Sequence, residues 1–219
     1  MSKKTKIILS IAAAVAVLAI GGVYAYLTYT TSVTNTFTVG NVSATLTEPG
    51  WTAAETADPN AHSNIYPGQV FDKDPTVTLG ETSSPAVIFI EVCYPNQEAV
   101  TIGTDGKKQA AAVTQLFTPG SLNEGWTELT SKSKTDTTAK TITRVYAYND
   151  ELDKGESATV FDTVTFANIA EGQSLTSLDV VVKADIIQAG GMAKAGDKYT
   201  SAELGDIYDK FVAQNTAAE

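Results

Sequence analysis

Eight residues decide the fold of this chain: Ala86-Val87-Ile88-Phe89-Ile90-Glu91-Val92-Cys93. They are apolar at both odd-numbered and even-numbered positions. A strand with one face in water alternates between apolar and polar residues, whereas a strand covered on both faces is apolar throughout. The stretch therefore predicts a central strand that is buried on both faces. Cys93 is the only cysteine of the chain, so we expect a buried structural thiol and no internal disulfide.

Segments on both sides of this stretch alternate between apolar and polar residues and predict further strands. They cover residues 31–46, with a bend at Gly40-Asn41, and residues 72–79, 142–148, 160–166 and 178–187. Turn residues separate them, and 142–148 is joined to 160–166 either as a hairpin or by a longer loop. Pro75 favours the start of a strand or an edge position. No repeat of about 20 to 50 residues is found, so solenoid and propeller folds are unsupported. The expected architecture is therefore two packed antiparallel sheets.

Two further segments have the composition or spacing of helices. Residues 107–117 contain three consecutive alanines and an apolar stripe, and predict a helix between strands. Thr200 and Glu203 have the spacing of a capping box, and apolar residues then recur at helical intervals, at Leu204, Ile207, Tyr208, Phe211 and Val212. The small, polar stretch 52–64 predicts a surface loop. The predicted fold class is mainly β: a jelly-roll-like antiparallel sandwich with helical insertions and a C-terminal helix.

The first 25 residues have the layout of a secretory signal peptide. Three lysines precede an apolar run over 7–20, and small side chains at Val23 and Ala25 suit a signal peptidase. We expect cleavage between Ala25 and Tyr26. The alternative is a retained membrane anchor, because residues 24–27 extend the apolar run towards the roughly 20 residues that span a bilayer. Cleavage would leave a secreted chain of single-domain length that meets the membrane only as a precursor.

The chain is acidic. Its net charge at neutral pH is −10, and because residues 1–25 carry three lysines and no acidic residue, the mature chain carries −13. Such a surface repels nucleic acid and anionic lipid, so neither is an expected partner. Solubility of a secreted protein is the simpler explanation for the acidity.

The residues that a hydrolase would need are scarce. A zinc peptidase uses two histidines one helical turn apart and a glutamate base, and this chain has His62 alone, in a polar stretch where we expect it to be solvated. A serine triad also needs a histidine, and the motif Gly-x-Ser-x-Gly is absent. The sequence therefore predicts no enzyme and no catalytic residue.

Oxygen ligands for calcium could come from four residues, Asp58, Asn60, Asp72 and Asp74. Their spacing does not match an EF-hand loop, and turn and capping roles fit them better. Trp51 and Trp126 are not clustered with other aromatic residues, so packing is their expected role. No metal ligand and no cofactor-binding residue is predicted.

Two stretches near the N-terminus, 21–28 and 35–42, resemble the TasA and camelysin family of secreted bacterial proteins, whose signal peptides are handled by a signal peptidase of the SipW type. The likeness continues at 46–51, 67–77 and 182–189, and is sparse over 98–141. Leu27 and Tyr29 stand where family members commonly have phenylalanine and an acidic residue.

The resemblance implies an exported jelly-roll subunit that assembles into extracellular fibres of a biofilm matrix or cell surface. It also implies donor-strand exchange, in which residues 26–36, freed by signal cleavage, add a strand to a neighbouring copy and 37–219 form the sandwich domain. The residues of this segment suit the task because they favour extended structure without charge or proline: Tyr26, Leu27, Tyr29, Thr31 and Val33. The implied partners are other copies of the chain and the SipW-type peptidase.

Three alternatives stay open. Residues 26–36 could pair within their own domain or be disordered after cleavage. The mature chain could be a monomeric adhesin or binding module that uses the loops 52–64 and 96–108. Camelysin is described as a metallopeptidase, so the resemblance also carries an enzymatic alternative, which the lone His62 disfavours.

Overall fold

β4 (Ala86–Ala99) is the central strand of the fold and extends beyond the stretch quoted above. In the computed structural model, which describes residues 41–216, the side chains of Val87, Ile88, Phe89 and Ile90 are fully buried. The even-numbered side chains of β4 from Ala86 to Tyr94 contribute to one hydrophobic cluster, whereas Val87 and Phe89 contribute to another. The prediction of a central strand covered on both faces is confirmed.

An antiparallel sheet, here called the β4 sheet, is built around this strand. Its order is β12-β4-β9-β7, with β12 at Val181–Gln188, β9 at Thr141–Tyr148 and β7 at Trp126–Glu128. β8 (Lys134–Asp136) pairs with β9, β5 (Ala112–Gln115) pairs with the last residues of β4, and a short 3-10 helix, η1 (Thr130–Lys132), precedes β8. The strand predicted over 142–148 is thus confirmed, and the one predicted over 178–187 forms but begins only at Val181.

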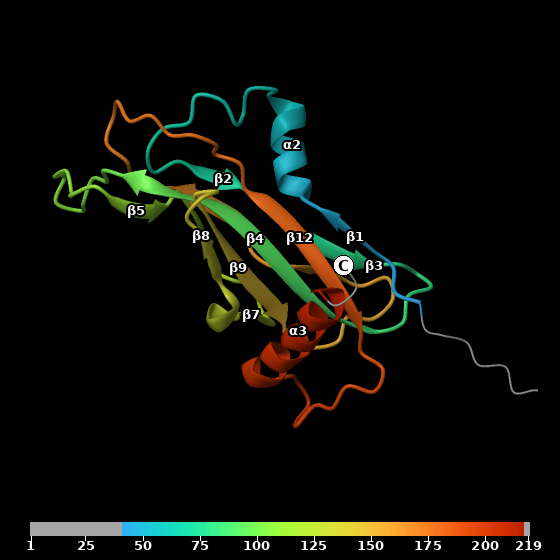
Figure 1. Ribbon diagram of the computed structural model, residues 1–219. Helices are drawn as coiled ribbons and strands as arrows, with labels where there is room; N and C mark the ends of the chain where they lie inside the picture. Colours follow the sequence, from blue (N-terminus) through green and yellow to red (C-terminus); the bar gives the residue numbers. More distant parts are fainter. Residues whose placement is uncertain (1–40, 217–219) are drawn as a thin grey trace, which may run out of the picture. The chain divides into compact units, whose positions relative to one another are not determined.

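A second layer packs against the β4 sheet (Figure 1). It contains two three-stranded antiparallel sheets: β1 (Ala44–Thr47), β3 (Thr76–Leu79) and β10 (Ser157–Thr159), and then β2 (Val70–Asp72), β11 (Thr163–Phe166) and β6 (Phe117–Pro119). Backbone bonds link the two sheets, because the Lys73 amide donates to the Asp162 carbonyl and the Val160 amide to the Pro75 carbonyl, each at 3.0 Å. Pro75 directly precedes β3, one of the two positions that the sequence favoured.

The inner core lies between the two layers. It joins Ile88, Ile90 and Tyr94 of β4 to side chains of the second layer: Phe71, Val77, Leu79, Phe117, Val164 and Phe166. Within it the hydroxyl oxygens of Tyr94 and Tyr146 lie 3.4 Å apart, and burial raises the pKa of Tyr146 to about 12. The fold is therefore mainly β, with antiparallel sheets in a sandwich. The jelly-roll connectivity stays a prediction.

α3 (Ser201–Thr216) covers the other face of the β4 sheet (Figure 1). The Thr200 amide donates to Glu203 Oε2 at 2.8 Å and the Glu203 amide to Thr200 Oγ1 at 3.3 Å, so the predicted capping box is confirmed. Leu204 and Tyr208 then pack against the odd-numbered face of β4, where the rings of Phe89 and Tyr208 are 5.4 Å apart. The predicted C-terminal helix is confirmed.

The predicted helix over 107–117 is wrong. No helix forms there, because β5 and β6 occupy its second half, with Val113 paired to Glu98 and Phe117 paired to Phe166. The advantage of alanine over most residues in a helix is less than about 1 kcal/mol per residue. The backbone hydrogen bonds offered by the extended end of β4 outweigh that preference.

The predicted loop over 52–64 is wrong in its first half, where α2 (Pro49–Ala57) forms. Pro49 stands in the first turn, where the missing amide of proline costs no helical hydrogen bond. The Gly50 amide donates to the Asp74 carboxylate at 2.9 Å. The helix thus begins directly after β1, which ends at Thr47, with Glu48 at its N-cap position.

The connection between β9 and β11 is the longer of the two alternatives. The strands lie in different layers, and the chain between them passes through β10. Residues 160–162 carry the chain from one second-layer sheet to the other, so the strand predicted over 160–166 begins only at Thr163.

The alternating segment 31–46 is described only from residue 41 onward, and there it forms β1, which begins at Ala44. Everything before residue 41, including residues 26–36, lies outside the described residues.

Cys93 is half-buried and not buried as predicted. It belongs to the odd-numbered face of β4 but not to the cluster that α3 covers. Its partners across the sheet are Thr143 and Val181, and Val181 is exposed. The cover that α3 gives to this face ends before Cys93.

Between residues 41 and 216, no helix has the length and apolar character needed to cross a bilayer.

Candidate functional site

β12 forms the edge of the β4 sheet. It pairs with β4 along its whole length and, within residues 41–216, with no strand on its other side. On the β4 side, the Ala189 amide donates to the Pro85 carbonyl at 2.9 Å. Successive residues of an antiparallel strand direct their backbone groups to opposite sides, so Val182, Ala184, Ile186 and Gln188 direct theirs outward. These groups can accept another strand.

The side chains along this edge are incompletely covered. Val182, Ala184 and Ile186 pack on the inner core but are only half-buried, whereas the side chains of β4 behind them are fully buried. β1 lies beside β12 without pairing to it, and its side chains Ala44 and Leu46 are also half-buried against the inner core. We give the name β1–β12 seam to the row of half-buried side chains Ala44, Leu46, Val182, Ala184 and Ile186. At this seam, partly exposed apolar side chains lie beside the outward backbone groups of an edge strand.

A pocket of about 430 Å³ lies where the chain enters β12. Its apolar wall comes from the β2-β11-β6 sheet of the second layer, from the chain before β2 and from the residues before β12: Ile65, Phe71, Phe117, Val164, Leu178 and Val180. Its polar wall comes mainly from α2 and the chain that follows it: Trp51, His62, Asn64, Lys73 and Asp179. Val180 belongs both to the pocket and to the half-buried row that packs on the inner core, so the pocket continues the seam.

His62 is packed in this polar wall, and the prediction of a solvated histidine is wrong. Its side chain is 15% exposed, and its ring stacks on Trp51 with centroids 3.5 Å apart and an interplanar angle of 5°. Nδ1 lies 3.5 Å from Glu55 Oε1. Among residues 41–216 no three His, Cys, Asp or Glu side chains are grouped as a metal site would need.

Lys73 supplies the buried charge of the pocket wall. It is 5% exposed, and its Nζ lies 2.7 Å from Glu48 Oε1 and 4.8 Å from the centre of the Trp51 ring. Burying an ammonium group is costly unless a carboxylate compensates it, and Glu48 supplies that carboxylate. The pair holds α2 against β2, and it leaves the pocket without an uncompensated charge from Lys73.

The remaining residues weighed from the sequence have structural roles. Asp74 accepts from the first turn of α2, and Asp58 Oδ1 accepts from the Asn60 amide at 2.9 Å, so the predicted capping and turn roles are confirmed. Asp72 is exposed on β2. Trp126 is buried against Tyr148, with ring centroids 5.4 Å apart, which confirms packing as its role.

A charged cluster lies beneath α3 on the outer face of β12 and β4. Asp185 is 6% exposed, and its Oδ1 lies 2.9 Å from Lys183 Nζ. Glu91, on the neighbouring strand, accepts from the Tyr208 hydroxyl at 2.5 Å, and Lys183 Nζ is 3.9 Å from it. Burial raises the pKa of the Asp185 carboxyl above its usual range, and the hydrogen bond and charge of Lys183 only partly oppose that effect.

Asp185 should make the stability of the domain fall as pH rises. Because its pKa is raised, the folded state holds the proton more tightly than the unfolded state, in which the pKa is about 3.9. The contribution of Asp185 to the free energy of unfolding therefore decreases as pH rises from about 4 through the higher folded pKa. Asp185→Asn removes this dependence. The free energy of unfolding of the variant relative to that of the wild type, measured with urea, should therefore increase as pH rises. The exposed Asp72→Asn is the control, and a difference that stays constant with pH would contradict the assignment.

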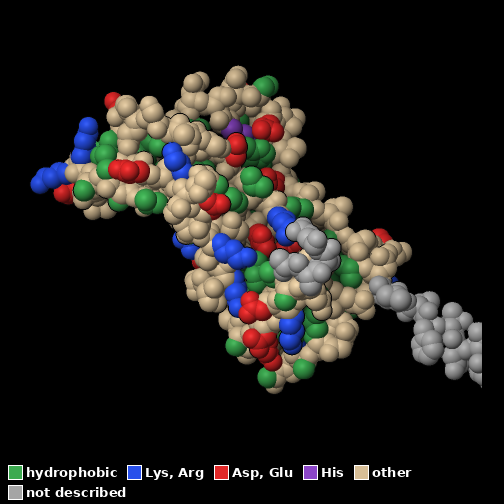
Figure 2. All heavy atoms as spheres, in the orientation of Figure 1, with side chains coloured by type: hydrophobic (Ala, Val, Ile, Leu, Met, Phe, Trp, Pro, Cys, Tyr) green, Lys and Arg blue, Asp and Glu red, His purple; other side chains and the backbone are tan. Residues whose placement is uncertain are grey.

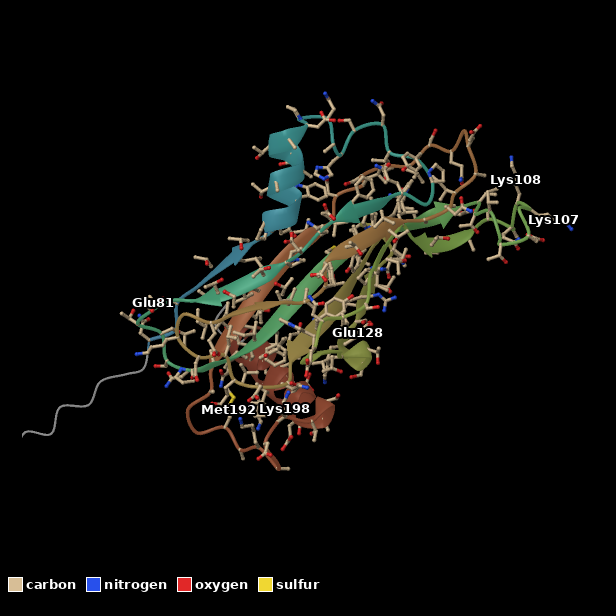
Figure 3. The ribbon with its side chains drawn as sticks, turned by 180° about the vertical axis from the view of Figure 1, so that it is seen from behind. Glu81, Lys107, Lys108, Glu128, Met192 and Lys198 are labelled. Carbon is tan, nitrogen blue, oxygen red and sulfur yellow. The ribbon has the colours of Figure 1, made fainter. Side chains whose placement is uncertain are left out.

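The structure brings only part of the predicted functional sequence together. Residues 52–64 contribute His62 and Asn64 to the pocket, whereas 96–108 form the end of β4 and a loop with Lys107 and Lys108 at its tip, opposite the end that carries Glu81 (Figure 3). The pocket could not be predicted from the sequence, because its walls come from segments far apart in the chain. The predicted cleavage site, Ala25 and Tyr26, and the predicted polymerisation residues lie outside the described residues: Tyr26, Leu27, Tyr29, Thr31 and Val33.

The chain was compared with protein-family models, with curated proteins and with solved structures, and none of the three comparisons finds a match.

Proposed function

We propose that this chain is a secreted structural subunit that polymerises into extracellular filaments of a biofilm matrix or cell surface. After signal cleavage between Ala25 and Tyr26, residues 26–36 of one copy add as a strand to the β12 edge of the next. The observation that supports this proposal is the β1–β12 seam, where outward backbone groups and a half-buried apolar row lie together. Both are features that strand addition would satisfy.

The chemistry of residues 26–36 suits this edge. The segment contains no charge and no proline, so every residue can donate a ladder hydrogen bond and none has to be desolvated as an ion. Leu27, Tyr29, Thr31 and Val33 share one parity and would all face the same side of an added strand. Each subunit then offers one strand and accepts another. Such a head-to-tail contact does not close on itself, so the product is a filament.

Deletion of residues 26–34, with the signal junction rebuilt ahead of Asn35, tests the proposal. The shortened protein should remain monomeric, because the donor has lost the residues that cover the seam. Electron microscopy and sedimentation of the purified mature chains measure the result, with a chain of intact length in which 26–34 are replaced by a Gly-Ser linker as the matched control. Filaments of normal length from either variant would contradict the proposal.

A monomeric binding module is the second candidate, and the pocket beside α2 is the observation that favours it. A pocket of a few hundred Å³ with apolar walls and a few polar groups is the usual form of a small-ligand site. In that case the mature chain should stay monomeric at high concentration with residues 26–36 intact. We propose no catalytic role, because the one histidine is stacked on Trp51 and no second histidine accompanies it.

A further inference from the structure

The pocket and the open edge form one continuous surface. Leu178, Asp179 and Val180 line the pocket, and the next residue, Val181, begins β12. A strand that added to the outward side of β12 and continued past Val181 would therefore pass over the pocket. Since a strand rises about 3.3 Å per residue, the two features are only one or two residues apart for such a strand.

The pocket suits a side chain that is apolar over most of its surface and polar at one end. Ile65, Phe71, Phe117 and Leu178 form an apolar wall, while Asn64 and Asp179 place hydrogen-bonding groups beside it. Lys73 is already compensated by Glu48, and charges of both signs are interspersed over the face shown in Figure 2. An anionic occupant would find Lys73 already paired, and a cationic one would gain little from Asp179, because that carboxylate is exposed to solvent. An uncharged aromatic ring with a hydroxyl group fits the pocket best.

We propose that the pocket binds the side chain of Tyr29 from the N-terminal segment of a second copy of this chain. The inference rests on the proposed function. Tyr29 is the one aromatic residue in the apolar row of the donor segment, which continues with Thr31 and Val33.

The position of the pocket also fixes the direction of the added strand. With Tyr29 level with Val180, a strand parallel to β12 places Thr31, Val33 and Asn35 level with Val182, Ala184 and Ile186. An antiparallel strand with the same anchor would reach only Lys183, level with Tyr26, at which the mature chain would begin. It would leave the rest of the seam uncovered. Of the two directions, only the parallel one both places Tyr29 at the pocket and covers the half-buried side chains of β12.

Disulfide trapping with the full mature chain tests the contact. Cys93→Ser removes the only native thiol, and two proteins are then made in that background, an affinity-tagged Tyr29→Cys and an untagged Leu178→Cys. After mixing and oxidation, a mixed dimer should appear on a non-reducing gel in at least about five times the yield of the matched pair Thr28→Cys with Leu178→Cys. Thr28 has the opposite parity and would point away from the pocket.

The outcomes separate this inference from the proposed function. Filaments that form without a mixed dimer above the Thr28→Cys control overturn the pocket assignment and leave the filament proposal standing. A mixed dimer without filaments by electron microscopy supports the pocket assignment and contradicts the filament. A chain that carries both cysteines and closes into a faster-migrating monomer, without cross-linking to other copies, overturns the second copy as the occupant.

Discussion

Ala184→Pro is expected to stop filament growth and leave the subunit folded. Ala184 lies in the middle of β12, opposite Ile90 of β4, and its backbone groups point away from β4. Proline there removes an outward N–H without removing a bond inside the sheet, and its ring occupies the space of an added strand. A penalty of about 3 kcal/mol at the junction would raise the concentration needed for assembly by roughly 100-fold.

Sedimentation and electron microscopy over a range of concentrations measure this effect. Ala184→Val is the matched control, since it adds a β-branched side chain at the same position and keeps the amide. It should assemble as the wild type does. Circular dichroism and thermal unfolding should show that the proline variant is folded. Filaments of Ala184→Pro at the wild-type concentration would exclude the β12 edge as the acceptor.

Phe89→Ala should produce the largest loss of stability of any change considered. Phe89 is fully buried in the first half of β4, between Ala147 and Asp185 on the neighbouring strands, and its ring contacts Tyr208 of α3. The substitution removes an aromatic ring from the cluster between sheet and helix and leaves a cavity. Such changes cost about 3 to 5 kcal/mol, a large part of the stability of a typical domain.

Urea unfolding followed by fluorescence gives the free energy of unfolding of each protein. Val113→Ala is the control, because Val113 is 68% exposed on β5 and surface substitutions usually change stability by less than about 0.5 kcal/mol. A loss below about 1 kcal/mol for Phe89→Ala would show that α3 does not depend on this contact. The slope of the transition should be unchanged if both proteins unfold in one step.

The parts of the fold that could be predicted are those in which local pattern and tertiary packing agree. The stretch around Phe89 is apolar on both parities because both faces of β4 are covered, and the spacing from Thr200 to Tyr208 is helical because one side of α3 faces the sheet. The helix predicted around Ala111 failed where pattern and packing disagree, because that segment hydrogen-bonds to the far end of β4. Local propensity is too weak to resist such pairing.

The candidate site could be predicted only in part. The preference of the proposed donor segment, residues 26–36, for extended structure is visible in the sequence, because it depends on composition alone. The acceptor is not, because Ala184 alternates with its neighbours like any residue of a half-buried strand, and only the sheet order leaves its outer side open. The pocket was equally hidden. It needs Trp51, Phe117 and Leu178 together, and they meet only when the two layers are assembled.

The long central strand has a mechanical consequence. β4 is held by β12 on one side and by β9 on the other, both antiparallel to it, with hydrogen bonds perpendicular to its length. Tension applied along β4 would load these bonds in shear, all at once, instead of unzipping them in turn. In the proposed filament, tension should therefore break the junctions, each held by one added strand, before it pulls a subunit apart.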